Sequence, residues 1–323
     1  MKILELFNGY GTASFALKRL GIDYELVGYS DIDKYANQCF KQNHCPDDVD
    51  DKLKLGDVTK IDEKALPDFD LLTGGFPRQA FSVAGKMQGE LDPRGTLFYE
   101  IIRIAEHKQP KYMLLENVKG LTSKKFKNTF DKILSELNRI GYYVHWKVLN
   151  TKDYGIPQNR ERVWFACMHK DLVPNPHIFT FPEKEELKLF VKDLLDKDVD
   201  SKYNLSEKAI RGKVTSNYQD RKPFDVNSIC PTLKCGGDEK NFISPTLTTE
   251  LSRGYGNLFN PKRLHELIGN WRRLTPNECF KLHGFKDNEV KLINISDTRA
   301  YKLAGNGQSV NVVEKILSEM FKQ

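Results

Sequence analysis

Short apolar runs alternate with segments of helical periodicity from residue 2 to residue 168, and this rhythm constrains the fold more than any other feature. The apolar runs cover residues 2–7, 24–28, 70–73, 112–116, 142–149 and 163–168. The first helical segment ends at Gly21, and its apolar face is formed by Ala13, Ala16, Leu17 and Leu20. Strands separated by helices are typical of βαβ units. The sequence therefore predicts an α/β fold with a doubly wound, mostly parallel sheet.

Composition narrows the broad class of the protein. A length of 323 residues suits two domains or one large fold that carries an insertion. The proportions of 29% charged and 39% hydrophobic residues exclude a disordered or collagen-like chain. The net charge of +6 permits a nucleic-acid partner without requiring one. No apolar run is long enough to span a membrane, the first residues lack the apolar core of a signal peptide, and the six cysteines show no paired zinc spacing. We therefore expect a cytoplasmic protein with free thiols, no metal and no membrane partner.

The alternating pattern does not continue through the whole chain. Residues 1–184 form the predicted α/β domain, whereas residues 185–268 are first densely charged and then polar and glycine-rich, as in a smaller, irregular, β-rich domain. Residues 269–323 form a C-terminal segment that we expect to return to the first domain. It contains a helix start with Thr275 as N-cap and Glu278 three positions later, and it ends in an amphipathic helix.

A glycine turn follows the first apolar run. It reads Phe7-Asn8-Gly9-Tyr10-Gly11, and glycines there let a ligand approach the backbone at the carboxyl end of a strand. The turn lacks the third glycine of a dinucleotide fingerprint and the Gly-Lys-Ser/Thr of a P-loop, so phosphate is not the expected ligand. Asp31 occupies a position where carboxylates accept hydrogen bonds from ribose hydroxyls, and Asp57 follows Gly56 in a similar setting. The pattern favours an adenosine ligand without phosphates; the alternative is a tight βα turn with solvated carboxylates.

Further motifs occur in a fixed order along the chain. They are Gly74-Gly75-Phe76-Pro77-Arg78-Gln79, Glu116-Asn117-Val118, Gln158-Asn159-Arg160-Glu161-Arg162 and Gly305-Asn306. With them, the chain resembles the DNA (cytosine-5) methyltransferases of bacterial restriction–modification systems and phages. The resemblance implies a Rossmann-like enzyme that uses S-adenosylmethionine, acts on double-stranded DNA and swings the target cytosine out of the duplex.

The resemblance also implies roles for single residues. In the family a thiolate adds to C6 of cytosine, and C5 then takes the methyl group. Glu116 matches the acid near N3, and Arg162 matches the arginine that holds the carbonyl oxygen of the base, with Arg160, Gln158 and Gln79 as supporting residues. The residues that match the cofactor site are Phe7, Gly9, Gly11, Asp31, Ile32, Asp57, Val58, Pro77, Leu97 and Asn306.

Each match has a structural alternative. Glu116 at the end of a strand could cap a helix, the Gln-Asn-Arg-Glu-Arg stretch could be a surface ladder of ion pairs, and Asn306 could be an ordinary turn asparagine.

The chain departs from the family at one catalytic position. Arg78 stands where the family has its nucleophilic cysteine, and a guanidinium has donors but no lone pair that can attack carbon. None of the six cysteines is placed by the sequence to reach C6. We therefore predict that this chain does not methylate cytosine and that Arg78 pairs with Glu116. Arg78 has two possible origins: the inactivation of a working methylase, or a degenerate copy that retains only binding. Because the other catalytic motifs are intact, we favour inactivation.

Residues 185–268 occupy the place of the family's target-recognition domain. The candidate DNA contacts are Ser82, Ala84, Lys86, Lys234, Arg253, Tyr255 and Asn257. Ser82 and Lys86 suit phosphates, while Ala84 is small for filling the gap that an everted base leaves. Arginine and asparagine can read guanine and adenine edges, although each candidate could instead touch phosphate or nothing. We expect a monomer, with a cognate restriction endonuclease as a further partner. The alternatives are a non-catalytic DNA-binding relative and an RNA cytosine methyltransferase, which the size of this region disfavours.

Overall fold

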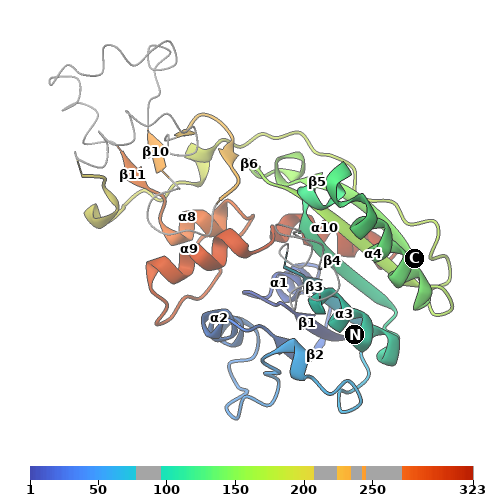
Figure 1. Ribbon diagram of the computed structural model, residues 1–323. Helices are drawn as coiled ribbons and strands as arrows, with labels where there is room; N and C mark the ends of the chain where they lie inside the picture. The colour runs from blue at the N-terminus through green and yellow to red at the C-terminus, as the bar shows by residue number, and fades with distance from the viewer. Residues whose placement is uncertain (78–95, 207–223, 234–241, 245–270, 323) are drawn as a thin grey trace. The chain divides into compact units, whose positions relative to one another are not determined.

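The computed structural model describes residues 1–77, 96–206, 224–233, 242–244 and 271–322 (Figure 1). The chain divides into two compact units. The first contains Met1–Asn150, Glu161–Lys184 and Val310–Gln323, and the second contains Thr151–Arg160 and Glu185–Ser309. Within the C-terminal segment, the last helix thus belongs to the first unit and the residues before it belong to the second.

A six-stranded sheet forms the centre of the first unit, in the order β2-β1-β3-β4-β7-β5. Its strands are β1 (Lys2–Leu6), β2 (Glu25–Ser30), β3 (Leu71–Gly75), β4 (Tyr112–Val118), β5 (Tyr142–Asn150) and β7 (Glu161–His169). β2, β1, β3 and β4 run parallel, whereas β7 is antiparallel to both β4 and β5. The mostly parallel α/β sheet predicted from the alternating pattern is confirmed.

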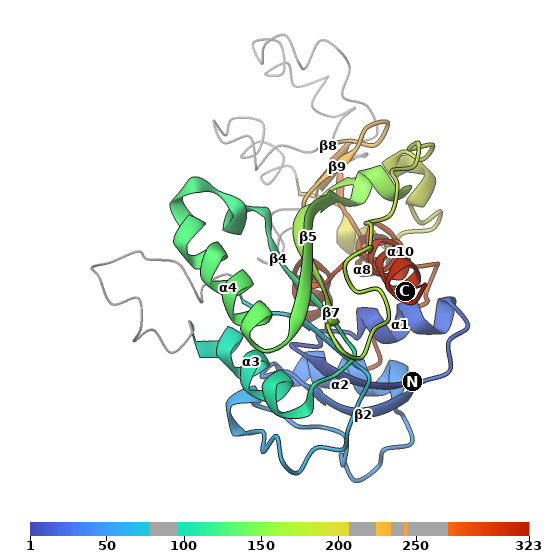
Figure 2. The same cartoon turned by 90° about the vertical axis from the view of Figure 1, so that its right-hand side faces the viewer.

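Helices cover both faces of this sheet. They are α1 (Thr12–Arg19), α2 (Lys34–His44), α3 (Thr96–Lys108), α4 (Lys127–Arg139) and α10 (Val310–Met320). α3 and α4 lie on one side of the sheet, and α1 and α10 lie on the other (Figure 2). On the α3 and α4 side, buried Ile101 and Ile133 share a core with Leu72 and Leu115 of the strands. Burial on both faces explains why the strands are apolar runs rather than alternating sequences.

The second unit contains short elements. They are β6 (Gln158–Asn159), β8 (Phe224–Asp225), β9 (Cys230–Pro231), β10 (Phe242–Ser244), β11 (Arg272–Arg273), α8 (Pro276–Lys281) and α9 (Asp297–Asn306). β11, β10 and β8 form one small sheet, and β6 pairs with β9. The predicted start of α8 is confirmed: the Thr275 hydroxyl accepts from the Glu278 amide, and the Glu278 carboxylate accepts from the Thr275 amide.

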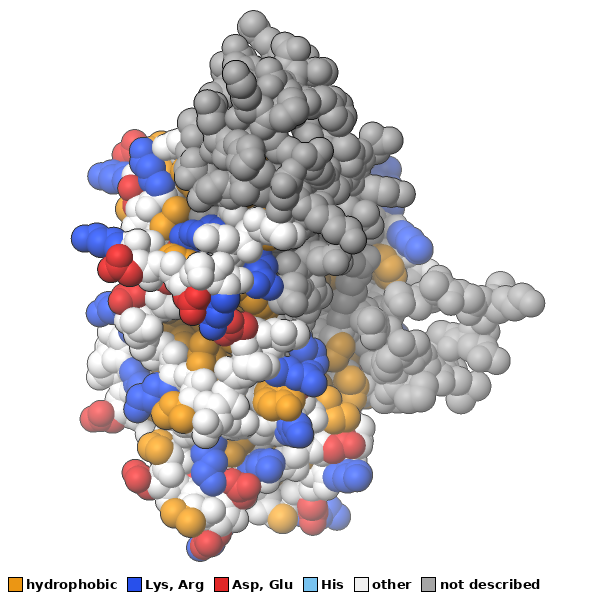
Figure 3. Space-filling view, turned by 90° about the vertical axis from the view of Figure 1, so that its left-hand side faces the viewer, with side chains coloured by type: hydrophobic (Ala, Val, Ile, Leu, Met, Phe, Trp, Pro, Cys, Tyr) orange, Lys and Arg blue, Asp and Glu red, His pale blue; other side chains and the backbone are white. Residues whose placement is uncertain are grey.

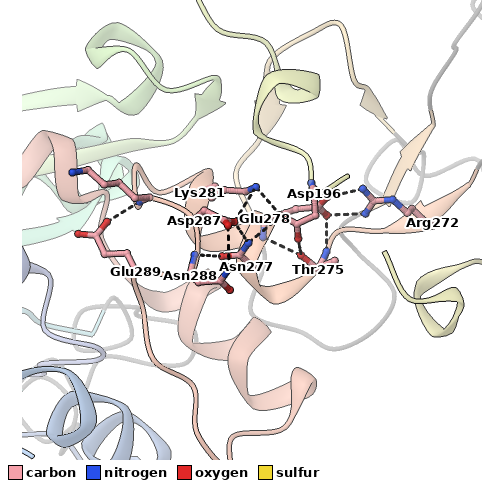
Figure 4. Close-up of polar contacts among 10 residues, drawn as sticks. Asp196, Arg272, Thr275, Asn277, Glu278, Lys281, Asp287, Asn288 and Glu289 are labelled. Carbon is pink, nitrogen blue, oxygen red and sulfur yellow. Dashed lines mark hydrogen bonds and ion pairs between the residues drawn. The ribbon is translucent and has the colours of Figure 1, made fainter. Parts of the chain in front are cut away.

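A polar network surrounds this helix start (Figure 4). Arg272 donates to both carboxylate oxygens of the fully buried Glu278, at 2.7 and 2.6 Å. The Asp196 amide donates to the same carboxylate, and the Asp196 side chain accepts from Thr275 and Lys281. Burial acts to raise the pKa of Asp196, but hydrogen bonds, led by the one from Lys281, bring it below its ordinary value. The network ties the segment around Asp196 to α8 and β11.

The described surface carries charges of both signs. On the face seen in Figure 3, lysines and arginines are interspersed with aspartates and glutamates. None of the helices in the described parts of the chain is long and apolar enough to cross a membrane.

Candidate active site

The first unit brings the predicted site residues to one edge of its sheet. Because β2, β1, β3 and β4 are parallel, the segments that follow their carboxyl ends meet at that edge. Phe7 follows β1, and Asp31 follows β2. Pro77 lies two residues beyond β3, and Glu116 lies two residues before the end of β4. This edge is therefore the candidate active site.

The glycine turn is tied to the end of β2. The Asn8 amide donates to the Ser30 carbonyl at 3.2 Å, and the Gly9 amide donates to the Asp31 carboxylate at 3.1 Å. Gly9 has φ +53° with open space where a Cβ would stand, whereas a Cβ on Gly11 at φ +81° would meet His44 at 2.4 Å. Gly9 thus faces room for a ligand, and Gly11 is required by close packing.

Three hydrogen bonds orient Asp31. Besides the Gly9 amide, its carboxylate accepts from the Asp33 amide at 2.9 Å, and its own carbonyl accepts from the Asn37 side chain at 2.8 Å. The neighbouring Ile32 is 87% exposed. A fixed carboxylate beside an exposed apolar side chain suits a ligand that has hydroxyl groups next to a flat ring.

Asp57 is brought to the same end of β2. The Ser30 hydroxyl donates to the Gly56 carbonyl at 2.7 Å, and Asp57 caps the short 3-10 helix Val58–Lys60. Hydrogen bonds from the backbone and side chain of Thr59 lower the pKa of Asp57, so its carboxylate is charged at neutral pH. Val58 is buried in the core.

Glu116 and Arg162 meet across β4 and β7. Arg162 Nε lies 2.8 Å from Glu116 Oε1, and their side chains are only 15% and 11% exposed. Strand pairing explains the contact: Val118 is opposite Arg162, so Glu116 lies two residues away on the same face. Arg162 Nη1 donates to the Glu161 carbonyl, which fixes the guanidinium. Two motif residues distant in sequence thus form one ion pair.

Asn117 joins the ends of β3 and β4. Its buried amide donates to the Phe76 carbonyl at 3.0 Å, and its side-chain oxygen accepts from the Val118 amide at 2.8 Å. Pro77 is exposed at the end of this held segment, and Leu97 is partly buried against the core. Arg78 and Gln79 lie outside the described residues, so the pairing of Arg78 with Glu116 stays a prediction.

Arg160 and Asn306 belong to the second unit. Arg160 is buried, and its Nη2 donates to the carbonyls of Gly305 and Gly307, on either side of the exposed Asn306. Gln158 is also buried, in β6. Arg160 thus holds the backbone on both sides of Asn306, and its supporting role in catalysis stays a prediction. The DNA-contact candidates Ser82, Ala84, Lys86, Lys234, Arg253, Tyr255 and Asn257 all lie outside the described residues.

The described cysteines are poor nucleophiles. Cys39, Cys45, Cys167, Cys230 and Cys279 are buried free thiols. Burial raises the pKa of Cys39 to about 12 and that of Cys45 to about 11, and it raises the pKa of the other three as well. They are therefore protonated at neutral pH. In the described ranges, His, Cys, Asp and Glu side chains form no group of three that could hold a metal ion.

Two residues that contact the start of α1 were not predicted from the sequence. Glu5 is buried in β1, accepts from the Ser14 amide at 3.1 Å and from the Ser14 hydroxyl, and has its pKa raised by burial to about 7. His44 lies at the end of α2, directly under Gly11. A charged residue inside an apolar run was the available signal for Glu5; nothing local marked His44.

Comparison with known protein families identifies the family of the chain. Residues 1–322 match the model of the C-5 cytosine-specific DNA methylases. The chain belongs to this family. This confirms the resemblance drawn from the ordered motifs.

Within the family, several relatives align over almost the whole chain. Type II methyltransferase M.HhaI of Haemophilus parahaemolyticus is 35% identical, covering 98% of this chain and 93% of its own. Type II methyltransferase M.SsoII of Shigella sonnei is 38% identical over 99% of this chain and 80% of its own. The orphan methyltransferase M.SPRI of Bacillus phage SPR is 30% identical, with 99% and 97% covered.

Solved structures agree on the methylase fold. The S. pombe Dnmt2 methyltransferase superposes with a TM-score of 0.76 at 23% identity, covering 100% of this chain and 98% of that chain. The methyltransferase EhMeth of Entamoeba histolytica gives 0.73 at 19% identity, with 100% and 98% covered. The described part of the chain thus has the α/β methyltransferase fold of these neighbours.

Proposed function

We propose that this chain is a cytosine-5 DNA methyltransferase that binds S-adenosylmethionine and double-stranded DNA and everts its target base, but cannot complete methyl transfer because of Arg78. One observation carries the proposal. The Glu116–Arg162 pair lies at the carboxyl edge of the sheet, and Asn117 fixes the adjacent segment that leads into Arg78. These contacts support a site in which Glu116 and Arg162 hold the base, while Arg78 replaces the attacking group.

The carboxyl edge fits an adenosine ligand. Asp31 is already oriented to accept from ribose hydroxyls, Asp57 can accept from the adenine amine, and exposed Ile32 offers apolar surface to the ring. Open space at Gly9 lets a ligand approach the backbone. The further residues we assign to this site are Phe7, Gly11, Val58, Pro77 and Leu97; the match of Asn306 to the family's cofactor residues stays a prediction from the sequence. S-adenosylmethionine would supply the methyl group there.

Glu116 and Arg162 would hold the everted cytosine. A carboxyl group at N3 and a guanidinium at the carbonyl oxygen both draw electron density from the ring, which makes C6 open to attack. The pair at 2.8 Å fixes each group relative to the other, so both are oriented before a base arrives. Arg160 would support the site without touching the base, because it binds the backbone carbonyls on both sides of Asn306.

Arg78 would stop the reaction at the attack step. Covalent catalysis requires a lone pair on the nucleophile, and a guanidinium offers none. We propose that Arg78 instead pairs with Glu116 and partly fills the base pocket. The buried, protonated cysteines described above do not provide a substitute thiolate.

The second unit would carry DNA recognition. We propose residues 185–268 as the target-recognition domain of a cytoplasmic monomer, with Lys234, Arg253, Tyr255 and Asn257 at base edges or phosphates. A cognate restriction endonuclease would act on the same site. Binding through phosphates weakens steeply as salt rises.

Reversion of Arg78 tests the proposal. In Arg78→Cys we expect methyl transfer from labelled S-adenosylmethionine to duplex DNA to rise at least about a thousandfold over the unmodified chain. Arg78→Ala, which lacks both cation and thiol, should stay silent and serves as the control. A silent Arg78→Cys variant that still binds DNA would identify a binding module, and methylation of transfer RNA in preference to duplex would identify an RNA enzyme.

A further inference from the structure

The glycine turn is supported from below by the end of α2. His44 Nε2 lies 2.9 Å from the Tyr10 carbonyl oxygen, and His44 Nδ1 lies 3.3 Å from Lys18 Nζ, which also donates to the Asn43 carbonyl at 2.8 Å. An ammonium group can only donate, so Nδ1 accepts and the ring proton resides on Nε2. His44 therefore donates to the Tyr10 carbonyl in one defined tautomer.

Packing holds the same ring in place. The His44 ring stands edge-on to Phe15, with centroids 4.5 Å apart, and is tilted against Phe40 at 4.8 Å. Its edge occupies the space that a Cβ on Gly11 would need. Burial, followed by the charge of Lys18, lowers the pKa of His44 to about 3, so the ring stays neutral at physiological pH.

α2 thereby contacts the turn from both of its ends. At its start, Asp33 caps the helix and donates its amide to Asp31, whose carboxylate receives the Gly9 amide. At its end, His44 holds the carbonyl of Tyr10. The peptide groups on both sides of the Gly9-Tyr10 bond are thus fixed by one helix.

We propose that His44 is a positioning residue for the cofactor site, acting through the Tyr10 carbonyl to fix the backbone that the adenosine ligand approaches. His44 does not itself touch the ligand. The inference rests on the proposed function, because it assigns S-adenosylmethionine to this edge. It predicts that ligand affinity depends on the Nε2 donor, and not only on the volume of the ring.

Two substitutions at His44 separate donor from volume. His44→Phe keeps the ring and removes the donor, whereas His44→Gln places an amide donor near Nε2. Calorimetry with S-adenosylmethionine should give a dissociation constant about tenfold weaker for His44→Phe, and within about threefold of the unmodified chain for His44→Gln. His169→Phe is the matched control, because His169 is a buried histidine that contacts Gln109 rather than the turn.

Melting temperatures of the unliganded variants are measured beside the affinities. A purely structural role would lower the melting temperature of His44→Phe without changing its affinity, as we expect for His169→Phe. Equal affinity in His44→Phe and the unmodified chain would overturn the inference. Absence of binding by the unmodified chain would instead overturn the proposed function.

Lys18→Met covers the case in which His44→Phe does not fold. Lys18 is exposed, so its loss should be tolerated, but Nδ1 of His44 would then lose its donor and the Tyr10 carbonyl alone would favour the Nε2–H tautomer. We expect affinity to fall about threefold. An unchanged dissociation constant in Lys18→Met would contradict the proposed chain of contacts from Lys18 through His44 to the turn.

Discussion

Two buried glutamates, one in each unit, satisfy their carboxyl groups by different means. Glu278 receives both guanidinium arms of Arg272 and the amides of Thr275 and Asp196. Glu5 receives its hydrogen bonds from the amide and hydroxyl of Ser14. The charge of Glu278 is thus matched by a cation in hydrogen-bond contact, whereas that of Glu5 is met by neutral donors.

The difference matters for the protonation of Glu5, whose buried carboxyl group has no cation in hydrogen-bond contact. For Glu5, burial outweighs the Ser14 hydrogen bonds and the distant charge of Lys18, and its pKa rises to about 7. The Glu5 carboxyl sits beneath the first turn of α1, where it also caps the Ser14 amide. The edge that we assign to the cofactor thus has beneath α1 a group that titrates near neutrality, whereas the start of α8 is held by the ion pair of Arg272 with Glu278.

The largest expected effect is at Arg272. Arg272→Met leaves the Glu278 carboxylate buried without its cation, and breaking such a pair costs about 4 kcal/mol. Denaturant unfolding should show this loss in the free energy of unfolding of the second unit. Lys202→Met, at the exposed pair with Asp297 in the same unit, is the control and should cost under about 1 kcal/mol. A loss at Arg272 as small as the control would mean that the two glutamates do not differ as described.

The next effect is a pH dependence from Glu5. Because the folded pKa of about 7 lies above the ordinary value of 4.5, the folded state binds more protons between these values. Stability from Glu5 is therefore full below pH 4.5 and falls by about 3 kcal/mol as pH rises to 7 and above. Glu5→Gln keeps the contacts with Ser14 without a charge, so subtracting its unfolding free energies isolates this loss. Parallel curves for the two proteins from pH 4.5 to 8 would disprove it.

These regions also differ in how far the sequence predicts them. The Thr275–Glu278 capping box is local, so residue types at fixed spacing predict it correctly. The Arg272 and Asp196 contacts with Glu278 are not predictable in this way, because Asp196 lies far away in sequence. Glu5 stands in an apolar run that predicts its strand, but the run does not predict that Ser14 donates hydrogen bonds to the Glu5 carboxyl group.

The same limit applies to the candidate site. Parallel strands predict that Asp31 and Glu116 lie at one edge of the sheet, because that follows from topology alone. Which group each contacts depends on register and on loop conformation. The Glu116–Arg162 pair follows from the antiparallel register of β4 and β7, and the Asn117 bond to Phe76 follows from the way the chain leaves β3. Neither has a signature in local sequence.

A third glutamate sharpens the comparison with the smallest effect on stability. Glu116 has a cation like Glu278, but its site is at the edge that we assign to the base. Glu116→Gln keeps the shape and can still accept from Arg162, so unfolding should change by about 1 kcal/mol. In an Arg78→Cys background, however, the same change should lower methyl transfer about a hundredfold, because the acid at N3 is lost.

The control is Glu161→Gln, at the exposed pair of Glu161 with Lys119, one residue before Arg162. It should leave both the unfolding free energy and the rate of methyl transfer nearly unchanged. If Glu116→Gln in the Arg78→Cys background transfers methyl groups at the full rate, then Glu116 contributes to the stability of the fold alone, as Glu278 does.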